Sequence, residues 1–161
     1  MSGEKDLKQA QAVFKALCDQ LDSRGWHYKK DQENLMIECG VQGEDLPMEL
    51  RVRVDKERKI VSLLSQIPFV VPENRRSALA VAVSAANFMM IDGSFDYNYL
   101  TGKIIFRMTS SFLDSLIGKE LFGYMISCSC YTIDVFNDKF LLVAKQDMSD
   151  SEILKYIRGG K

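Results

Sequence analysis

The chain has 161 residues and a net charge of −1, with 47% hydrophobic and 27% charged residues, which are ordinary values for a folded globular domain and exclude a disordered chain. The balanced charge gives no general attraction to nucleic acid or to an anionic membrane. The polar N-terminus, MSGEKDLKQA, lacks the apolar centre of a secretory signal, and no later apolar run is long enough to cross a bilayer. We therefore expect a cytoplasmic protein without nucleic-acid or membrane partners, in which the four cysteines stay reduced.

The first predicted elements are one helix and a meander of four strands. Apolar residues recur at steps of three and four through residues 6–24, which predicts an amphipathic helix that Gly25 ends. The period then changes to two, which predicts strands at 26–28, 35–39, 48–55 and 60–67. The polar stretch 29–34 is predicted as a turn, and Pro68 stops the fourth strand.

A second helix is predicted to begin near Pro72, because proline is tolerated in a first helical turn and Glu73 suits the positive end of the helix dipole. Its polar side is narrow, so we expect it to be mostly buried, and its small residues allow another backbone to come close. Asn87 lies on the polar side near the helix end. We expect its side chain to bond local backbone groups, in preference to a ligand.

A hairpin follows, with its turn at residues 100–102 and with Gly102 placed for a positive φ angle. Phe95, Tyr97 and Tyr99 alternate onto one face of the hairpin. This aromatic face belongs either to the core or to a recognition platform, and core is the favoured interpretation.

The last third of the chain is predicted as a long helix, from about Ser115 to Lys145, with two apolar faces. One face holds Leu121, Met125, Cys128, Val135 and Leu142; the other holds Phe122, Ile126, Ile133 and Phe140. Two faces require a second packing partner, which is either another helix of this chain or a second subunit. We take Phe122, Ile126, Ile133 and Phe140 as the candidate protein-binding or dimer surface. A capping box, Ser149-x-x-Glu152, predicts a final short helix.

No catalytic or metal-binding pattern stands out. His27 is the only histidine, so a Ser–His or Cys–His nucleophile would need it, yet its strand context is typical of a surface residue. Cys128 and Cys130 point to different sides of a helix, and no C-x-x-C pair completes a zinc site. Phosphate-binding glycine motifs are lacking. We therefore predict no enzyme activity, no cofactor and no metal site; a hydrolase using His27 with Cys39 or a serine is the least favoured alternative.

Basic residues gather in one strand and its turn, interrupted by Asp55 and Glu57. They are Arg51, Arg53, Lys56, Arg58 and Lys59. Without interleaved aromatic residues, this cluster is typical of a solvated sheet face and not of a nucleic-acid site.

Two segments, IPFVVPENRRSALAVAVSAANF at 67–88 and GSFDYNYLTGKIIFRM at 93–108, resemble the YbjN-like family, bacterial proteins described as sensory transduction regulators. The shared features are the proline-flanked segment, Arg75 or Arg76 at the helix start, Asn87, the glycines of the hairpin and Arg107. The resemblance spans about residues 6–158, and that family is similar in fold to the dimeric chaperones of type III secretion systems. It implies a single α+β domain over 1–161: a twisted, mainly antiparallel sheet with helices packed on it, in the order α-β-β-β-β-α-β-β-α-α. It carries over no site residue.

These observations predict a non-enzymatic protein-interaction module, a regulator or chaperone-like protein that forms a homodimer and can hold another protein or peptide. The alternative is a small-ligand-binding sensor domain with a pocket between the helices and the sheet.

Overall fold

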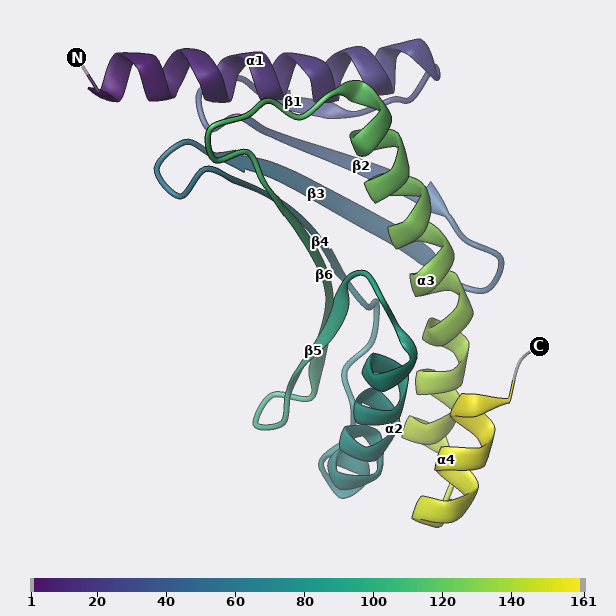
Figure 1. Ribbon diagram of the computed structural model, residues 1–161. Coiled ribbons are helices and arrows are strands. Elements are labelled where there is room, and N and C mark those ends of the chain that lie inside the picture. Colours follow the sequence, from purple (N-terminus) through teal and green to yellow (C-terminus); the bar gives the residue numbers. More distant parts are fainter. Residues whose placement is uncertain (1, 160–161) are drawn as a thin grey trace.

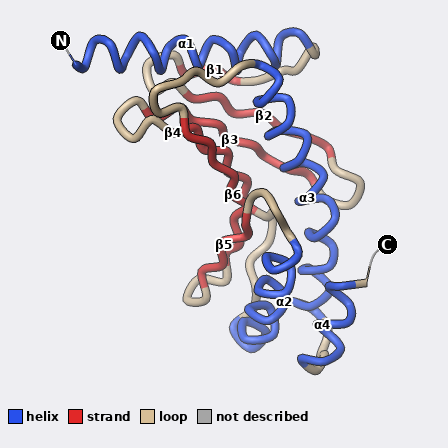
Figure 2. The backbone as a smooth tube through the Cα atoms, viewed as in Figure 1, coloured by secondary structure: helices blue, strands red, loops and turns tan. Residues whose placement is uncertain are grey.

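The computed structural model describes residues 2–159, which form four α-helices and six strands (Figures 1 and 2). They are α1 Ser2–Ser23, β1 Lys29–Asp31, β2 Met36–Gln42, β3 Pro47–Asp55, β4 Ile60–Gln66, the short 3-10 helix η1 Glu73–Arg75, α2 Arg76–Met89, β5 Ser94–Asn98, β6 Lys103–Ser111, α3 Lys119–Lys145 and α4 Asp150–Arg158. The predicted fold class and order of elements are therefore confirmed.

The six strands form one open sheet in the order β1-β2-β3-β4-β6-β5, and every neighbouring pair is antiparallel. Burial alternates along β3, where Met48, Leu50, Val52 and Val54 are buried and the residues between them are exposed or half-buried. This alternation shows that the helices cover one face of the sheet and leave the other to solvent. In Figure 1, α1 lies across one end of the sheet and α3 runs over the strands toward α2 and α4.

The first strand lies three residues later than predicted, inside the stretch expected to be a turn. The cause is a tight turn at residues 32–35, in which the Asp31 carboxylate accepts hydrogen bonds from the backbone N–H and the side-chain amide of Asn34. Because this turn takes only four residues, Lys29 and Lys30 remain extended and pair with β2. The Asn34 hydrogen bonds also hold the pKa of the Asp31 carboxyl below its usual value.

The candidate surface predicted on α3 is wrong, because its residues belong to the core of the chain itself. Phe122, Ile126, Ile133 and Phe140 are all between 0% and 5% exposed. Within this chain α3 packs against α1, α2, α4 and the sheet, so its second apolar face is covered by other elements of the same chain. Of the two packing partners considered for that face, it is therefore the intramolecular one that covers it.

An aromatic cluster joins the hairpin to α3. The Phe95 ring centroid lies 4.9 Å from that of Phe140, 5.7 Å from Phe136 and 5.2 Å from Phe106, all in edge-on arrangements. Phe95 is thus a core residue, whereas Tyr97 is half-buried and Tyr99 is exposed. The aromatic face of the hairpin begins in the core and ends in solvent.

Two glycines set the ends of the hairpin. Gly102 has φ +70°, and a Cβ there would lie 2.4 Å from the Val71 carbonyl oxygen. Gly93 has φ +76°, and a Cβ there would lie 2.4 Å from the Phe106 ring. Both positions therefore need glycine for conformation and for space, as predicted for Gly102.

Candidate protein-interaction surface

Two side chains cap the C-termini of helices and hold α2, α3 and α4 against one another. The guanidinium of Arg75, just before α2, donates to the Val143 carbonyl at 3.1 and 3.2 Å and to the Gln146 carbonyl, and it pairs with Asp147 at 2.8 Å. The last carbonyls of a helix lack partners within the helix and carry partial negative charge. Arg75 satisfies those of α3 and fixes the start of α2 against the end of α3.

Lys139 has the same role for α4. This side chain is buried, yet its ammonium group donates to the Gly159 carbonyl at 2.6 Å and to the Ile157 carbonyl at 3.5 Å. It also lies 5.8 Å from the Phe136 ring and 5.9 Å from the Tyr156 ring, within the range of cation–π attraction. Lys139 therefore holds the end of α4 on α3, while the Ser149–Glu152 capping box fixes its beginning, as predicted.

The edge of the sheet at β5 is blocked by a side chain. The Ile104 carbonyl of β6 accepts a hydrogen bond from the Ile67 N–H, so the backbone groups of Ile104 point away from β5. Tyr97 lies opposite Ile104 in β5, and its backbone N–H and carbonyl therefore point away from β6. The backbone groups of Phe95, two residues earlier in the same strand, point the same way. The Asn87 carboxamide occupies this edge at Phe95, donating to its carbonyl at 3.0 Å and accepting from its N–H at 2.8 Å. Asn87 therefore makes the backbone contact expected from the sequence and closes the edge to strand addition at that residue.

A groove of about 540 Å³, open to solvent, lies between α2 and α4. Its walls are mostly small or apolar, with one charged residue. They are Ala80, Val81, Ser84, Ala85, Phe88, Leu154 and Arg158, which we call the α2–α4 surface. The small side chains of α2, noted in the sequence as allowing close approach, thus face α4 and leave a hollow beside it.

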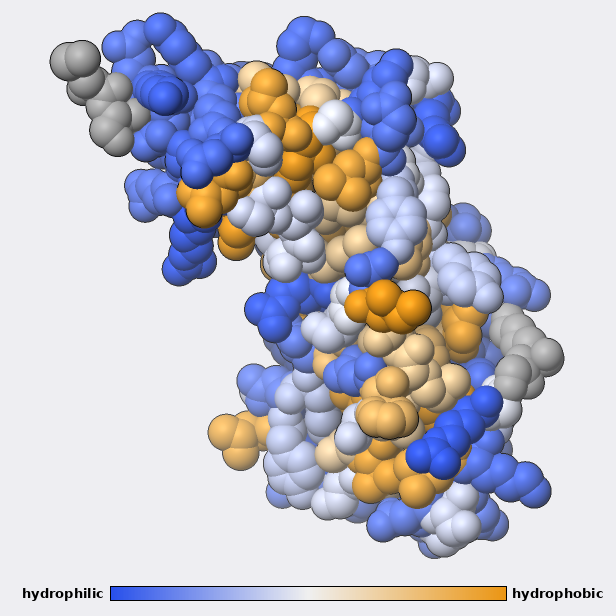
Figure 3. Space-filling model, in the orientation of Figure 1, coloured by the Kyte–Doolittle hydropathy of each residue, from blue (hydrophilic) through white to orange (hydrophobic). Residues whose placement is uncertain are grey.

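One residue of this surface, Phe88, protrudes into solvent, and two more exposed apolar side chains follow it in the chain. Phe88 is 87% exposed, Met89 47% and Ile91 98%, all within four residues at the end of α2. Figure 3 shows apolar residues gathered along the middle of the lower half of the visible face, over α2 and toward α4. Exposed apolar groups next to an apolar groove are typical of a protein-binding surface.

Sequence reasoning missed Phe88 because this residue follows Asn87 on the polar side of the helix. The available signal was its spacing: Phe88 lies four residues after Ser84, so it extends the small-residue side of α2 and not the buried side.

The other candidate residues lie elsewhere. His27 is exposed in the segment between α1 and β1, and all four cysteines are free, with Cys18 and Cys39 buried. Burial raises the pKa of Cys39 to about 11 and that of Cys130 to about 11, so both thiols stay protonated at neutral pH. Within residues 2–159, no three His, Cys, Asp or Glu side chains gather closely enough to hold a metal ion.

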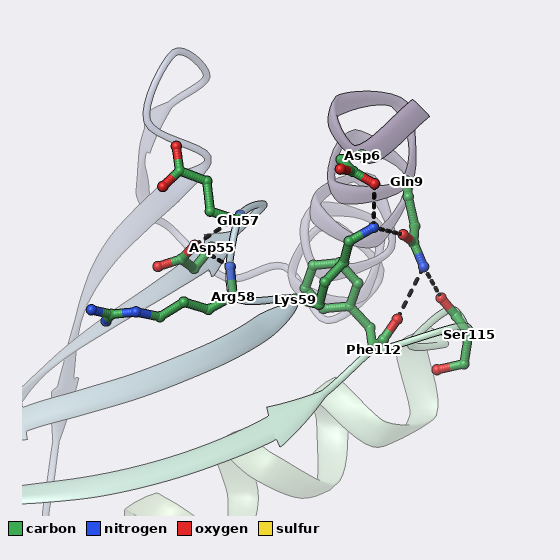
Figure 4. Close-up of polar contacts among 8 residues, drawn as sticks. All are labelled: Asp6, Gln9, Asp55, Glu57, Arg58, Lys59, Phe112 and Ser115. Carbon is green, nitrogen blue, oxygen red and sulfur yellow. Dashed lines mark hydrogen bonds and ion pairs between the residues drawn. The ribbon is translucent and has the colours of Figure 1, made fainter. Parts of the chain in front are cut away.

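The predicted basic cluster is tied into local structure (Figure 4). The Lys59 ammonium donates to Asp6 at 2.5 Å and to the Gln9 side chain at 2.6 Å, and Gln9 in turn donates to the backbone carbonyls of residues 112 and 115. The backbone N–H of Arg58 donates to the Asp55 carboxylate, which lowers the pKa of that carboxyl. On the strand itself, Arg51 pairs with Glu38 at 2.6 Å.

These features define an α+β protein with an open antiparallel sheet, helices over one face and an apolar groove between two of them. The crystal structure of YbjN from E. coli, provisionally described as a transcription regulator, is similar to this chain. The TM-score is 0.55, with 14% sequence identity over 75% of this chain and 85% of the YbjN chain. At this identity the likeness concerns the fold alone, and the chain therefore has a YbjN-like fold.

No family model matches the chain, and no curated protein matches its sequence. None of the helices within the described residues combines the length and apolar character that a membrane crossing requires.

Proposed function

We propose that this chain is a non-enzymatic, cytoplasmic protein-interaction module that holds a polypeptide on the α2–α4 surface. The observation that carries the proposal is the exposure of Phe88 in a groove whose other walls are mostly small or apolar, with the exposed Met89 and Ile91 close by in the chain. Aromatic side chains in such a position are common anchors of protein interfaces. The YbjN-like fold is shared with a protein provisionally described as a transcription regulator, so a regulatory role exercised through protein contacts is part of the proposal.

The shape of the groove favours a polypeptide over a small molecule. Small-ligand sites enclose most of the ligand surface, whereas this groove is widely open to solvent and lies between two helices. An amphipathic helix that inserts apolar side chains into a groove fits such a shape. The alternative of a metabolite sensor with a pocket between helices and sheet therefore has less support.

The free edges of the sheet favour the same conclusion. Strand β1 has only three residues, and Asn87 occupies the backbone of β5 at Phe95. Adding a strand of a partner to either edge would give few hydrogen bonds, so side-chain contacts at the helices are the better-supported binding mode.

The proposal is tested by selecting helical peptides from a random library against the intact chain and measuring their affinity by fluorescence anisotropy. We expect Phe88→Ser to weaken the selected peptides by at least about tenfold. Leu100→Ser, which removes an equally exposed side chain at the hairpin tip, is the matched control and should leave the affinity unchanged. A library that yields no binder, or binders that do not respond to Phe88→Ser, contradicts the proposal.

A further inference from the structure

The tip of the β5–β6 hairpin, residues 97–103, lies beyond the last firm anchors of both strands. In β5 this anchor is Phe95, whose ring is in the aromatic cluster and whose backbone is held by Asn87. In β6 it is Ile104, which is fully buried and accepts a hydrogen bond from the Ile67 N–H at 3.0 Å. Most residues between the two anchors are exposed, and the hairpin projects beside α2 (Figure 1). The tip therefore has little support from the core.

Among the described residues, three hydrogen bonds join the tip to Val71 and the first turn of α2, a contact that we call the hairpin seam. Two of the three involve side chains and are exposed to water, which competes for the same groups. In these bonds, each 2.8 or 2.9 Å long, the Val71 N–H donates to the Gly102 carbonyl, the Arg76 guanidinium donates to the Leu100 carbonyl, and the hydroxyls of Ser77 and Tyr99 are paired.

The hairpin seam also encloses two polar atoms without partners. Arg76 Nε and Tyr97 Oη have no hydrogen-bond partner among residues 2–159, and neither atom is accessible to solvent. Burial raises the pKa of the Tyr97 hydroxyl, and the nearby Arg76 charge acts against that rise. A buried polar group without a partner costs as much as one ordinary hydrogen bond contributes, or more. The closed seam therefore carries a penalty that offsets much of what its three hydrogen bonds contribute.

Opening of the seam relieves this penalty. The three hydrogen bonds are exchanged for bonds to water, and the two enclosed groups gain water that they lack in the closed state. The half-buried Tyr97 ring loses apolar contact on opening, and this loss favours the closed state. The opening free energy is thus small compared with that of unfolding the whole sheet, in which the buried strands would also be exposed.

We propose that residues 97–103 form a strap that closes reversibly over the start of α2 and opens while the rest of the sheet stays folded. The open state presents the Arg76 guanidinium and the Tyr97 hydroxyl to solvent, whereas the closed state conceals Arg76 Nε and Tyr97 Oη. The strap lies at the opposite end of α2 from Phe88, so this inference does not depend on the proposed function.

The first test is native-state hydrogen exchange of the intact chain, measured residue by residue by NMR. The amide hydrogen bond of Val71 crosses the hairpin seam and reports its opening, whereas the Val52 amide, in the central strand β3, reports unfolding of the sheet. We expect the protection factor of Val71 to be at least about tenfold lower than that of Val52 and to depend less on denaturant. Equal protection with equal dependence on denaturant overturns the inference, because the tip would then open only when the sheet unfolds.

The second test uses two substitutions that keep the aromatic ring and remove one hydroxyl. Tyr97→Phe removes a hydroxyl that finds a partner only in the open state, so the protection factor of Val71 should rise about threefold. Tyr99→Phe removes the hydroxyl bonded to Ser77, so the same protection factor should fall about threefold. The expected signs are opposite at equal ring size, so a general loss of packing cannot produce both.

The paired substitutions also separate the strap from fraying of the segment before α2. If Val71 exchanged through fraying alone, neither hydroxyl would affect its protection factor. No response to either substitution therefore overturns the inference, as does a fall in protection with Tyr97→Phe. Circular dichroism of both variants should match that of the wild type, because neither substitution removes a core side chain.

Discussion

The carboxamide of Asn87 pairs with both backbone groups of Phe95, as a neighbouring strand would. One side chain at the end of α2 thereby completes the edge of β5 and links the helix to the residue whose ring lies at the centre of the aromatic cluster. Asn87 is thus a polar residue on a mostly buried helix, and the role of its side chain is to satisfy nearby backbone groups.

Replacing Asn87 by alanine should lower the free energy of unfolding by about 1–3 kcal/mol, because it leaves the two backbone groups of Phe95 without their partner. Urea denaturation measures the change. Asn74→Ala, at an exposed position of η1, is the control and should change stability by less than about 0.5 kcal/mol. An equal effect of the two substitutions would show that the Asn87 contact has no energetic role.

The assignment of Phe140 to the core predicts a large effect of truncation. Phe140→Ala should cost about 3–5 kcal/mol, because it opens a cavity beside Phe95 and Phe136. Tyr131→Ala, on the exposed side of the same helix, should cost less than about 1 kcal/mol in thermal or urea unfolding. Comparable losses for the two variants would mean that α3 does not pack in the orientation described.

Lys139→Met keeps the apolar stem of the side chain and removes its cap on α4. We expect a loss of about 1.5–3 kcal/mol, the usual contribution of hydrogen bonds from a charged group, concentrated in α4. Hydrogen exchange should show faster exchange of the α4 amides, with little change in β3. Lys145→Met, an exposed lysine of α3, is the control, and protection of α4 that survives Lys139→Met would rule out the capping role.

The raised pKa values of the Cys39 and Cys130 thiols predict a loss of stability in alkali. The pKa of Cys39 and that of Cys130 are each raised from 9.0 to about 11, so the unfolded chain releases these protons before the folded chain does. Their contribution to folding is therefore complete below about pH 9 and declines as the pH rises toward 11. Unfolding free energies measured across this range should fall less steeply in the Cys39→Ala/Cys130→Ala double variant than in the wild type. Identical slopes would contradict the raised pKa values.

The sequence was sufficient to predict the order of elements, because the change of apolar period from about 3.6 to 2 marks each transition along the chain. Gly102 and the Ser149–Glu152 capping box have the predicted roles because both depend on residues a few positions apart. The predicted bounds of β1 were three residues too early, because the Asp31–Asn34 turn is shorter than the polar stretch 29–34 that contains it.

The interaction surface could not be predicted in the same way. A helical wheel shows that Phe122 and Phe140 share an apolar face of α3, but it does not show which elements cover that face. Those elements come from segments far apart in sequence, including α1 and α2. Phe88, by contrast, follows Asn87 on the polar side of α2, and only the position of α4 reveals that it borders a groove.

The pairing of α2 with α4 also has a consequence for synthesis of the chain. Arg75 and α2 contact Val143, Gln146 and α4, so this part of the molecule cannot close until the residues up to the end of α4 have been made. During translation the apolar face of α2 stays uncovered while the strands of the meander are already able to pair. A nascent chain of this protein is therefore most in need of protection from aggregation just before α4 appears, and removing α4 would make that exposed stage permanent.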